Sequence, residues 1–179
     1  MTPAFLEAVA LRYLERFDAT RAKLQARLER AAKMEFGRGA EVLDPEKLQG
    51  WIEELLDRYR ASGVIDDRRY AERLLESQRA RGASARAIVH KLRAQKVDTS
   101  VLEEITRGLD RAGELEAALR LVKRRRLGAF RPVAEQGERY AADLARLARA
   151  GFGFDVAKRA LGAGCDRVEY EPGEYDAVE

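Results

Sequence analysis

The side chains in this sequence with the clearest capacity for chemistry are basic residues that recur at helical spacing. Arg86, His90 and Arg93 lie four and three residues apart, so a helix would carry them on one face. Arginine and lysine bind carboxylates and phosphates through their charge and their N–H donors. The spacing therefore predicts contact with a nucleic acid or an acidic protein surface, although a solvated helix face would show the same spacing.

A denser cluster of positive charge occupies residues 123–126, which read Lys-Arg-Arg-Arg. It ends an apolar helical pattern, and cations at the C-terminal end of a helix also stabilise the helix dipole. We expect a binding role in addition to that stabilisation. The candidate partner-binding residues, in chain order, are Arg68, Arg69, Arg73, Arg79, Arg81, Arg86, His90, Lys91, Arg93, Lys123, Arg124, Arg125 and Arg126.

Residues that could catalyse a reaction or hold a metal are scarce. His90 is the only histidine and Cys165 the only cysteine, so neither a conventional Cys/His zinc site nor an internal disulfide can form. Asp66 and Asp67 precede an apolar helical pattern, where two acids favour the positive end of a helix dipole without any catalytic purpose. We therefore expect no catalytic residue, no cofactor, no metal and no enzymatic activity.

The elements that must position these side chains are predicted to be helices. The chain has 179 residues, of which 46% are hydrophobic and 36% charged, with only 4 prolines. Apolar residues recur at helical spacing and few β-branched runs suggest strands, so the sequence predicts an all-α fold. We expect helices at about residues 6–17, 20–28, 45–59, 67–81, 84–96, 99–110, 114–127, 138–150 and 154–161.

Capping residues mark several of the expected helix boundaries. Asp18 or Thr20 could begin the second helix, Asp44 suits the third, and Ser84 suits the helix that carries the basic stripe. Gly63 suits the left-handed position that follows a completed helix.

The large aromatic side chains follow the apolar stripes. Phe17 ends the first stripe, while Trp51, Tyr59, Tyr70 and Tyr140 lie on later ones. We expect these four to pack in the core rather than to stack on bases.

An internal repeat is visible when the helical segments are aligned. The alignment places Thr20 on Ser84 and Gly151 on Gly82. This spacing indicates a helical repeat protein, although any two amphipathic helical hairpins share some similarity. The aligned stretches are residues 11–28, 75–92 and 144–161.

Three blocks of the sequence resemble the RecX family. They read YLERFDATRAKLQARL, SGVIDDRRYAERLLESQRARGASARAIVHKLRAQKVD and LARLARAGFGFDVAKRAL. The middle block is the most specific, with a glycine, two apolar residues, a double aspartate, an aromatic-alanine pair and an Arg-Gly before a basic helix. Two features depart from the family pattern: residues 33–43 are long and rich in glycine, and Gly153 stands where the family has a serine cap.

The resemblance implies tandem three-helix modules, about nine helices in total, in an elongated curved row. It also implies a regulator that binds RecA and its filament on single-stranded DNA and modulates recombinase, ATPase and coprotease activities in DNA repair, recombination and the SOS response. The family has no motif of catalytic residues. The expected division of the chain is 1–63, 64–112 and 113–164 for the three modules and 165–179 for an acidic tail.

Charge is distributed unevenly along the chain. The net charge is +3, yet residues 166–179 hold six acids and one arginine, a charge of −5, which leaves about +8 on the rest. A basic body suits contact with nucleic acid or an acidic protein groove, and the acidic tail could compete for the same surface.

The remaining expectations concern partners and location. No signal-peptide pattern or membrane-length apolar run occurs, so we expect a cytoplasmic monomer. RecA is the partner that the resemblance implies, and direct contact with single- or double-stranded DNA stays open. The alternative function is a helix-turn-helix DNA-binding regulator, because a three-helix module with a basic last helix can enter a major groove.

Overall fold

The computed structural model describes residues 2–37, 44–109 and 111–162. Within these residues the chain forms nine α-helices, one short 3-10 turn and no strand, which confirms the all-α prediction. Cys165, the acidic tail and most of the glycine-rich stretch at 33–43 lie outside the described residues. The elements are α1 (Pro3–Leu14), α2 (Arg21–Phe36), α3 (Pro45–Ala61), α4 (Asp67–Ala80), α5 (Ala85–Ala94), α6 (Thr99–Arg107), α7 (Arg111–Arg125), η1 (Gly128–Phe130), α8 (Val133–Arg149) and α9 (Phe154–Gly162).

Several helices begin where a polar side chain accepts one of their first free N–H groups. Thr20, rather than Asp18, caps α2 by accepting from the N–H of Lys23. Asp44 caps α3 by accepting from the N–H of Glu46, with a proline at the first helical position. These caps satisfy donors that have no partner inside the helix.

The described residues gather into two compact units. The first comprises the described residues up to 77 together with 88–109, and the second comprises 78–87 together with 111–162. Helices α4 and α5 therefore each contribute residues to both units. The arrangement as three tandem modules remains a prediction.

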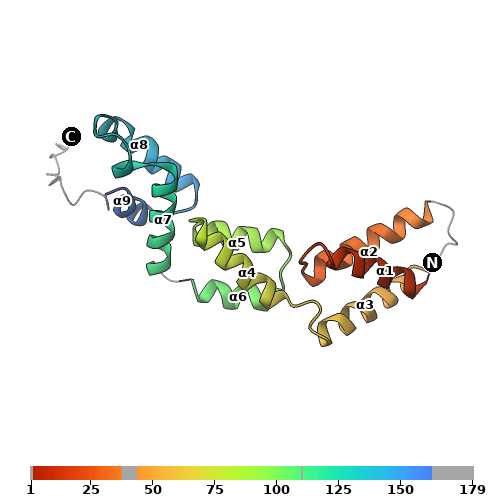
Figure 1. Cartoon of the computed structure of the whole chain (residues 1–179). Helices are drawn as coiled ribbons and strands as arrows, with labels where there is room; N and C mark the ends of the chain where they lie inside the picture. The colour runs from red at the N-terminus through yellow and green to blue at the C-terminus, as the bar shows by residue number, and fades with distance from the viewer. Residues whose placement is uncertain (1, 38–43, 110, 163–179) are drawn as a thin grey trace, which may run out of the picture. The chain divides into compact units, whose positions relative to one another are not determined.

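The core of the first unit lies among α1, α2 and α3, which pack side by side (Figure 1). Each helix supplies large aliphatic side chains to this core. The fully buried ones are Leu6 from α1, Leu24 and Leu28 from α2, and Ile52 and Leu56 from α3.

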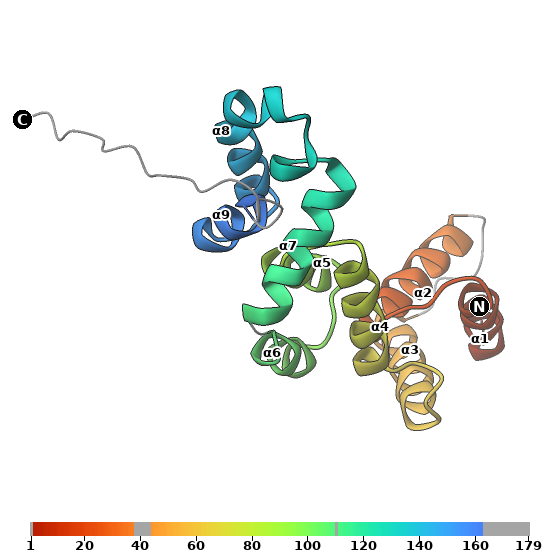
Figure 2. The same ribbon diagram turned by 60° about the vertical axis from the view of Figure 1, so that its left-hand side comes forward.

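In the second unit, α9 packs against α7 and α8 (Figure 2). The core of the second unit includes Ala117 and Val122 of α7, Leu147 of α8 and Leu161 of α9. Leu127, in the turn after α7, belongs to the same core. Small alanines on α7 allow α9 to approach closely.

Several details differ from the sequence-based expectations. Helix α8 begins at Val133 rather than near residue 138, and the first helix ends at Leu14, which leaves Phe17 55% exposed. Tyr59 is buried as predicted, but Trp51 is only half-buried and Tyr140 is 39% exposed. The core prediction is therefore wrong for Tyr140, whose side chain is exposed to solvent on α8.

Candidate interaction surface

Helix α5 carries the basic stripe that the sequence predicts. Ile88 and Leu92 are fully buried, and this leaves Arg86, His90 and Arg93 exposed on the helix. None of these three side chains has a hydrogen bond or ion pair with another described residue. Their charges are thus available to a partner.

Lys91 and Arg81 complete the group near α5. Lys91 is half-buried, and Arg81, in the turn before the helix, is exposed. Neither side chain has an ion pair with a described residue. Both remain available for contact.

The start of α5 is held by residues far along the chain, within the second unit. The Ser84 hydroxyl accepts from the N–H of Ala87 at 3.1 Å and donates to the carbonyl oxygen of Ala150 at 2.7 Å. The Glu114 carboxylate accepts from the N–H of Ala85 at 2.8 Å. Two side chains, Ser84 and Glu114, therefore accept free N–H groups of the first turn of α5.

Arg79 is bound to Glu114, which also holds the start of α5. Its guanidinium pairs with the Glu114 carboxylate at 2.8 Å, and the two side chains are only 15% and 14% exposed. It also donates to the carbonyl oxygen of Ala83. Arg79 therefore has a structural role, independent of any binding partner.

Three of the four arginines of α4 have partners within the first unit. Arg68 pairs with Glu104 of α6, and Arg73 pairs with Asp18 at 2.5 Å. Their side chains remain 56% and 55% exposed, so these ion pairs contribute little stability.

Arg69 donates to a carbonyl oxygen instead, that of Gly63, at 3.0 Å. This contact lies at the end of the preceding helix. Arg68, Arg69 and Arg73 can therefore meet a partner only by sharing or leaving an existing contact.

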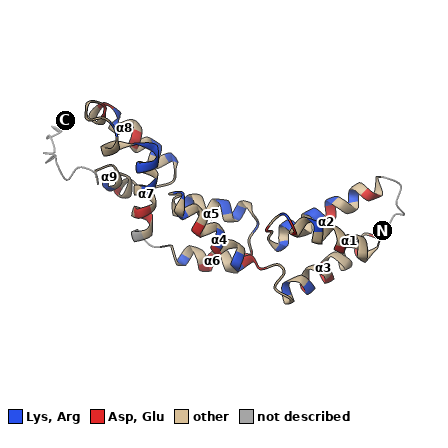
Figure 3. Ribbon diagram, viewed as in Figure 1, with Lys and Arg blue, Asp and Glu red and all other residues tan. Residues whose placement is uncertain are grey.

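The four side chains of the cluster at residues 123–126 are exposed at the end of α7. Blue segments mark this and the other basic stretches in Figure 3. None of the four side chains forms an ion pair with a described residue. This cluster is the densest free positive charge in the described part of the second unit.

A further set of free cations on α8 was not among the predicted site residues. Arg139, Arg146 and Arg149 are exposed and have no ion pair with a described residue. Their spacing of seven and three residues places them on one side of a helix. That spacing is visible in the sequence and could have identified them.

The aspartates near the start of α4 act as helix caps. Asp66 accepts from the N–H of Arg69 at 3.0 Å, and Asp67 accepts from the N–H of Arg21 at 2.8 Å and of Asp98 at 2.9 Å. Asp67 thereby joins the starts of three segments, which exceeds the dipole role expected for it. Hydrogen bonds from Ser100 lower the pKa of Asp98.

These aspartates line a cavity of about 350 Å³ in the first unit. Asp66, Asp67 and Asp98 share its wall with Arg21 and Arg60, among other residues. Each of these three carboxylates accepts at least one backbone N–H donor. The three acids therefore have a structural role in holding the segments around the cavity.

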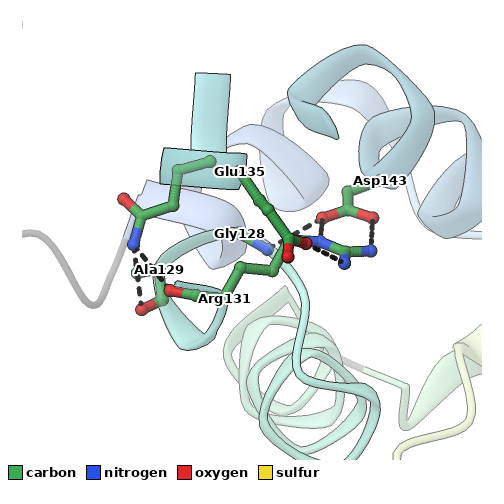
Figure 4. A network of polar contacts seen from close by, with 6 residues as sticks. Gly128, Ala129, Arg131, Glu135 and Asp143 are labelled. Atoms are coloured by element: carbon green, nitrogen blue, oxygen red, sulfur yellow. Dashed lines mark hydrogen bonds and ion pairs between the residues drawn. The ribbon is translucent and has the colours of Figure 1, made fainter. Parts of the chain in front are cut away.

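The buried carboxylate of the second unit is also structural. Asp143 is 1% exposed and accepts from Nε of Arg131 at 2.7 Å, from Nη2 at 2.8 Å and from the N–H of Gly128 at 2.9 Å (Figure 4). The hydrogen bonds from Arg131 hold the pKa of Asp143 below its ordinary value. This pair secures η1 against α8.

The described residues contain neither a cluster of metal ligands nor a membrane-spanning helix. No cluster of three or more His, Cys, Asp or Glu side chains could hold a metal ion there. In the same part of the chain, every helix is too short or too polar to cross a membrane.

Comparison with known proteins identifies relatives along nearly the whole chain. A protein of Myxococcus xanthus named "Regulatory protein RecX" is 35% identical over 167 residues, which cover 90% of this chain and 86% of the relative. Proteins of the same name from Thermobifida fusca and Mycobacterium leprae are 35% identical over 155 residues and 42% identical over 74 residues. They cover 85% and 41% of this chain, and 74% and 43% of their own lengths.

No family model and no solved structure matches the chain. The similarity to the Myxococcus xanthus protein extends over 90% of the chain. The relatives are named as regulatory proteins. The chain thus belongs to the RecX family of regulatory proteins.

Proposed function

We propose that this protein binds the RecA recombinase, including its filament on single-stranded DNA, and restrains recombinase, ATPase and coprotease activities during DNA repair, recombination and the SOS response. The observation that carries the proposal is the free basic stripe of α5, set in the most specific RecX block. Arg86, His90 and Arg93 are exposed and unpaired within the described residues. An acidic protein groove or a phosphate backbone is the kind of partner such a stripe attracts.

The mechanism proposed is steric and electrostatic, without a chemical step. Three-helix modules at 1–63, 64–112 and 113–164 would let one monomer span neighbouring RecA subunits in the cytoplasm. The described carboxylates that might suggest catalysis, Asp67 and Asp143, are occupied by backbone or arginine donors. We therefore assign no catalytic residue and no cofactor.

The experiment compares the wild-type protein with Arg86→Glu/Arg93→Glu in assays of the cognate RecA. Wild type should slow DNA-dependent ATP hydrolysis and block strand exchange at less than one copy per recombinase. The double variant should lose inhibition at least about tenfold, because that factor needs only about 1.4 kcal/mol of binding free energy. Its melting temperature should barely change, since exposed substitutions usually alter stability by about 0.5 kcal/mol or less.

The matched control is Arg12→Glu/Arg16→Glu, which reverses two other exposed arginines without a described ion pair. This control should inhibit like wild type. A comparison variant, Arg124→Glu/Arg125→Glu, tests the α7 cluster. If only that comparison variant loses inhibition, the contact surface belongs to α7 rather than α5. Tight binding to a specific duplex with no effect on RecA would instead favour a helix-turn-helix regulator.

A further inference from the structure

The cluster at residues 123–126 has no charge partner among the described residues. All four side chains are exposed, and none makes an ion pair there. The negative end of a helix dipole, equivalent to roughly half a charge, offsets only a small part of four cations. The cluster therefore keeps most of its positive charge and attracts acidic ligands.

The last turn of α9 lies directly beside this cluster. A Cβ atom added at Gly128 would come within 2.8 Å of the carbonyl oxygen and 3.1 Å of the Cα atom of Leu161. The backbone two residues after Arg126 thus touches the backbone of the residue before Gly162. Figures 1 and 2 both show α7 and α9 side by side.

The chain that continues from this point is acidic. Residues 166–179 contain six acids and a single arginine, Arg167, for a charge of −5. Only three residues lie between Gly162 and Asp166, so the four steps from one Cα atom to the other span at most about 14 Å. The first acid, Asp166, is therefore tethered within about 14 Å of Gly162, whose neighbour Leu161 contacts the turn after α7.

We propose that the acidic segment 166–179 docks on the basic cluster 123–126 of the same chain. The tether makes the contact efficient, because a short linker holds two groups at an effective concentration on the order of millimolar. Even a weak electrostatic contact is then substantially populated. The docked segment covers this part of the basic surface until a stronger acidic partner displaces it.

The α7 cluster is a better site for the segment than the arginines of α8. Its four cations are consecutive, whereas Arg139, Arg146 and Arg149 are spread over eleven positions with Glu135 and Glu138 close by in the sequence. Higher local charge density favours the α7 cluster. The α8 arginines consequently provide a matched control.

Zero-length carbodiimide cross-linking of the full chain tests the contact, because it joins a carboxylate to a lysine and Lys123 is part of the cluster. We expect tail peptides joined to Lys123, and fewer joined to Lys33 or Lys47 of the first unit. The Lys123 yield should fall about fivefold in Arg124→Gln/Arg125→Gln, since two surface charges each contribute modestly. It should fall similarly in 0.5 M salt, where screening shortens to a few ångströms (about 4 Å).

The control variant Arg139→Gln/Arg149→Gln should retain the Lys123 cross-link. An unchanged yield in Arg124→Gln/Arg125→Gln would mean that proximity alone, without charge, produces it, and the proposal would fail. Loss of the cross-link only in the α8 variant would also overturn it. Mixing isotopically light and heavy protein identifies cross-links between copies, which would contradict an intramolecular contact. The assay contains no RecA, so its outcome is independent of the proposed function.

Discussion

The side-chain hydroxyl of Ser84 donates a hydrogen bond to the carbonyl oxygen of Ala150 at 2.7 Å, across 66 positions of sequence. The same relationship occurs in the first unit, where Thr20 donates to the carbonyl oxygen of Gln95 at 2.8 Å. Both hydroxyls are fully buried, and both also cap their own helices. In both places a buried hydroxyl group caps the start of one helix and binds the end of another.

Replacing Ser84 by alanine should destabilise the protein by about 2 kcal/mol. The loss combines a helix cap, typically about 1 kcal/mol, with a buried carbonyl left without its donor, about 1–3 kcal/mol when nothing replaces it. Urea unfolding measures the difference. Ser77→Ala is the control, because Ser77 is exposed within α4 and makes no side-chain contact with a described residue. Equal stability of the two variants would contradict a structural role for the Ser84 contact.

A second test concerns Gly151, which follows Ala150, the acceptor of the Ser84 hydrogen bond. Gly151 has φ +93, and a Cβ there would lie 2.6 Å from the Ser84 hydroxyl oxygen. Gly151→Ala should therefore lose more than about 2 kcal/mol, from backbone strain and the clash together. Gly153→Ala should cost less, about 1 kcal/mol at most, because nothing lies within 4 Å of its Cβ position and the only loss is that alanine is a poorer N-cap than glycine. Thermal unfolding of both variants decides, and similar melting temperatures would refute the clash.

Much of the local structure follows from the sequence. The caps Thr20, Asp44 and Ser84 and the left-handed Gly63 are all confirmed, because each depends on its own side chain and the few residues beside it. The basic stripe of α5 is exposed as predicted, since the helical period alone separates it from Ile88 and its neighbours. Family membership is confirmed as well.

The long-range contacts could not be predicted in this way. The alignment of Gly151 on Gly82 agrees with the backbone, since both have positive φ and both come two residues after the end of a helix. The hydroxyl of Thr20 donates to the carbonyl oxygen of Gln95, and that of Ser84 donates to the carbonyl oxygen of Ala150. The residues beside Thr20 or Ser84 do not determine these partners, because the contacts join segments 75 and 66 positions apart. The pairing that occupies Arg79 was invisible for the same reason.

The Asp143–Arg131 pair predicts a pH dependence of stability. Its hydrogen bonds lower the pKa of Asp143 in the folded protein, so the carboxylate stabilises the fold fully above the unfolded-state pKa, about 3.9. That contribution is lost as the pH falls below this value and through the folded pKa. Asp143→Asn should cost about 3 kcal/mol at pH 7, because it breaks a buried pair.

The difference between Asp143→Asn and wild type should shrink as the pH is lowered from 5 toward 2. Urea unfolding at a series of pH values measures it. Asp155→Asn, at an exposed position of α9, serves as the control and should change stability by about 0.5 kcal/mol or less. A difference between Asp143→Asn and wild type that stayed constant at acid pH would show that Asp143 stabilises the fold by shape rather than by charge.

Arg79 and Arg81 separate a cation that builds the fold from one that is free to bind. The Arg79 guanidinium pairs with Glu114, which also caps α5 through the N–H of Ala85, and both charged side chains are largely buried. Arg79→Gln leaves that carboxylate without its cation and should cost about 1–3 kcal/mol. Arg81→Gln removes an exposed charge with no described partner and should change stability by about 0.5 kcal/mol or less.

The effects on RecA inhibition should be the reverse of those on stability, at temperatures well below unfolding. Arg81→Gln should weaken inhibition, while Arg79→Gln should remain active. Chemical denaturation together with ATPase inhibition tests both halves, and an Arg79 variant that is stable but inactive would make Arg79 a contact residue after all.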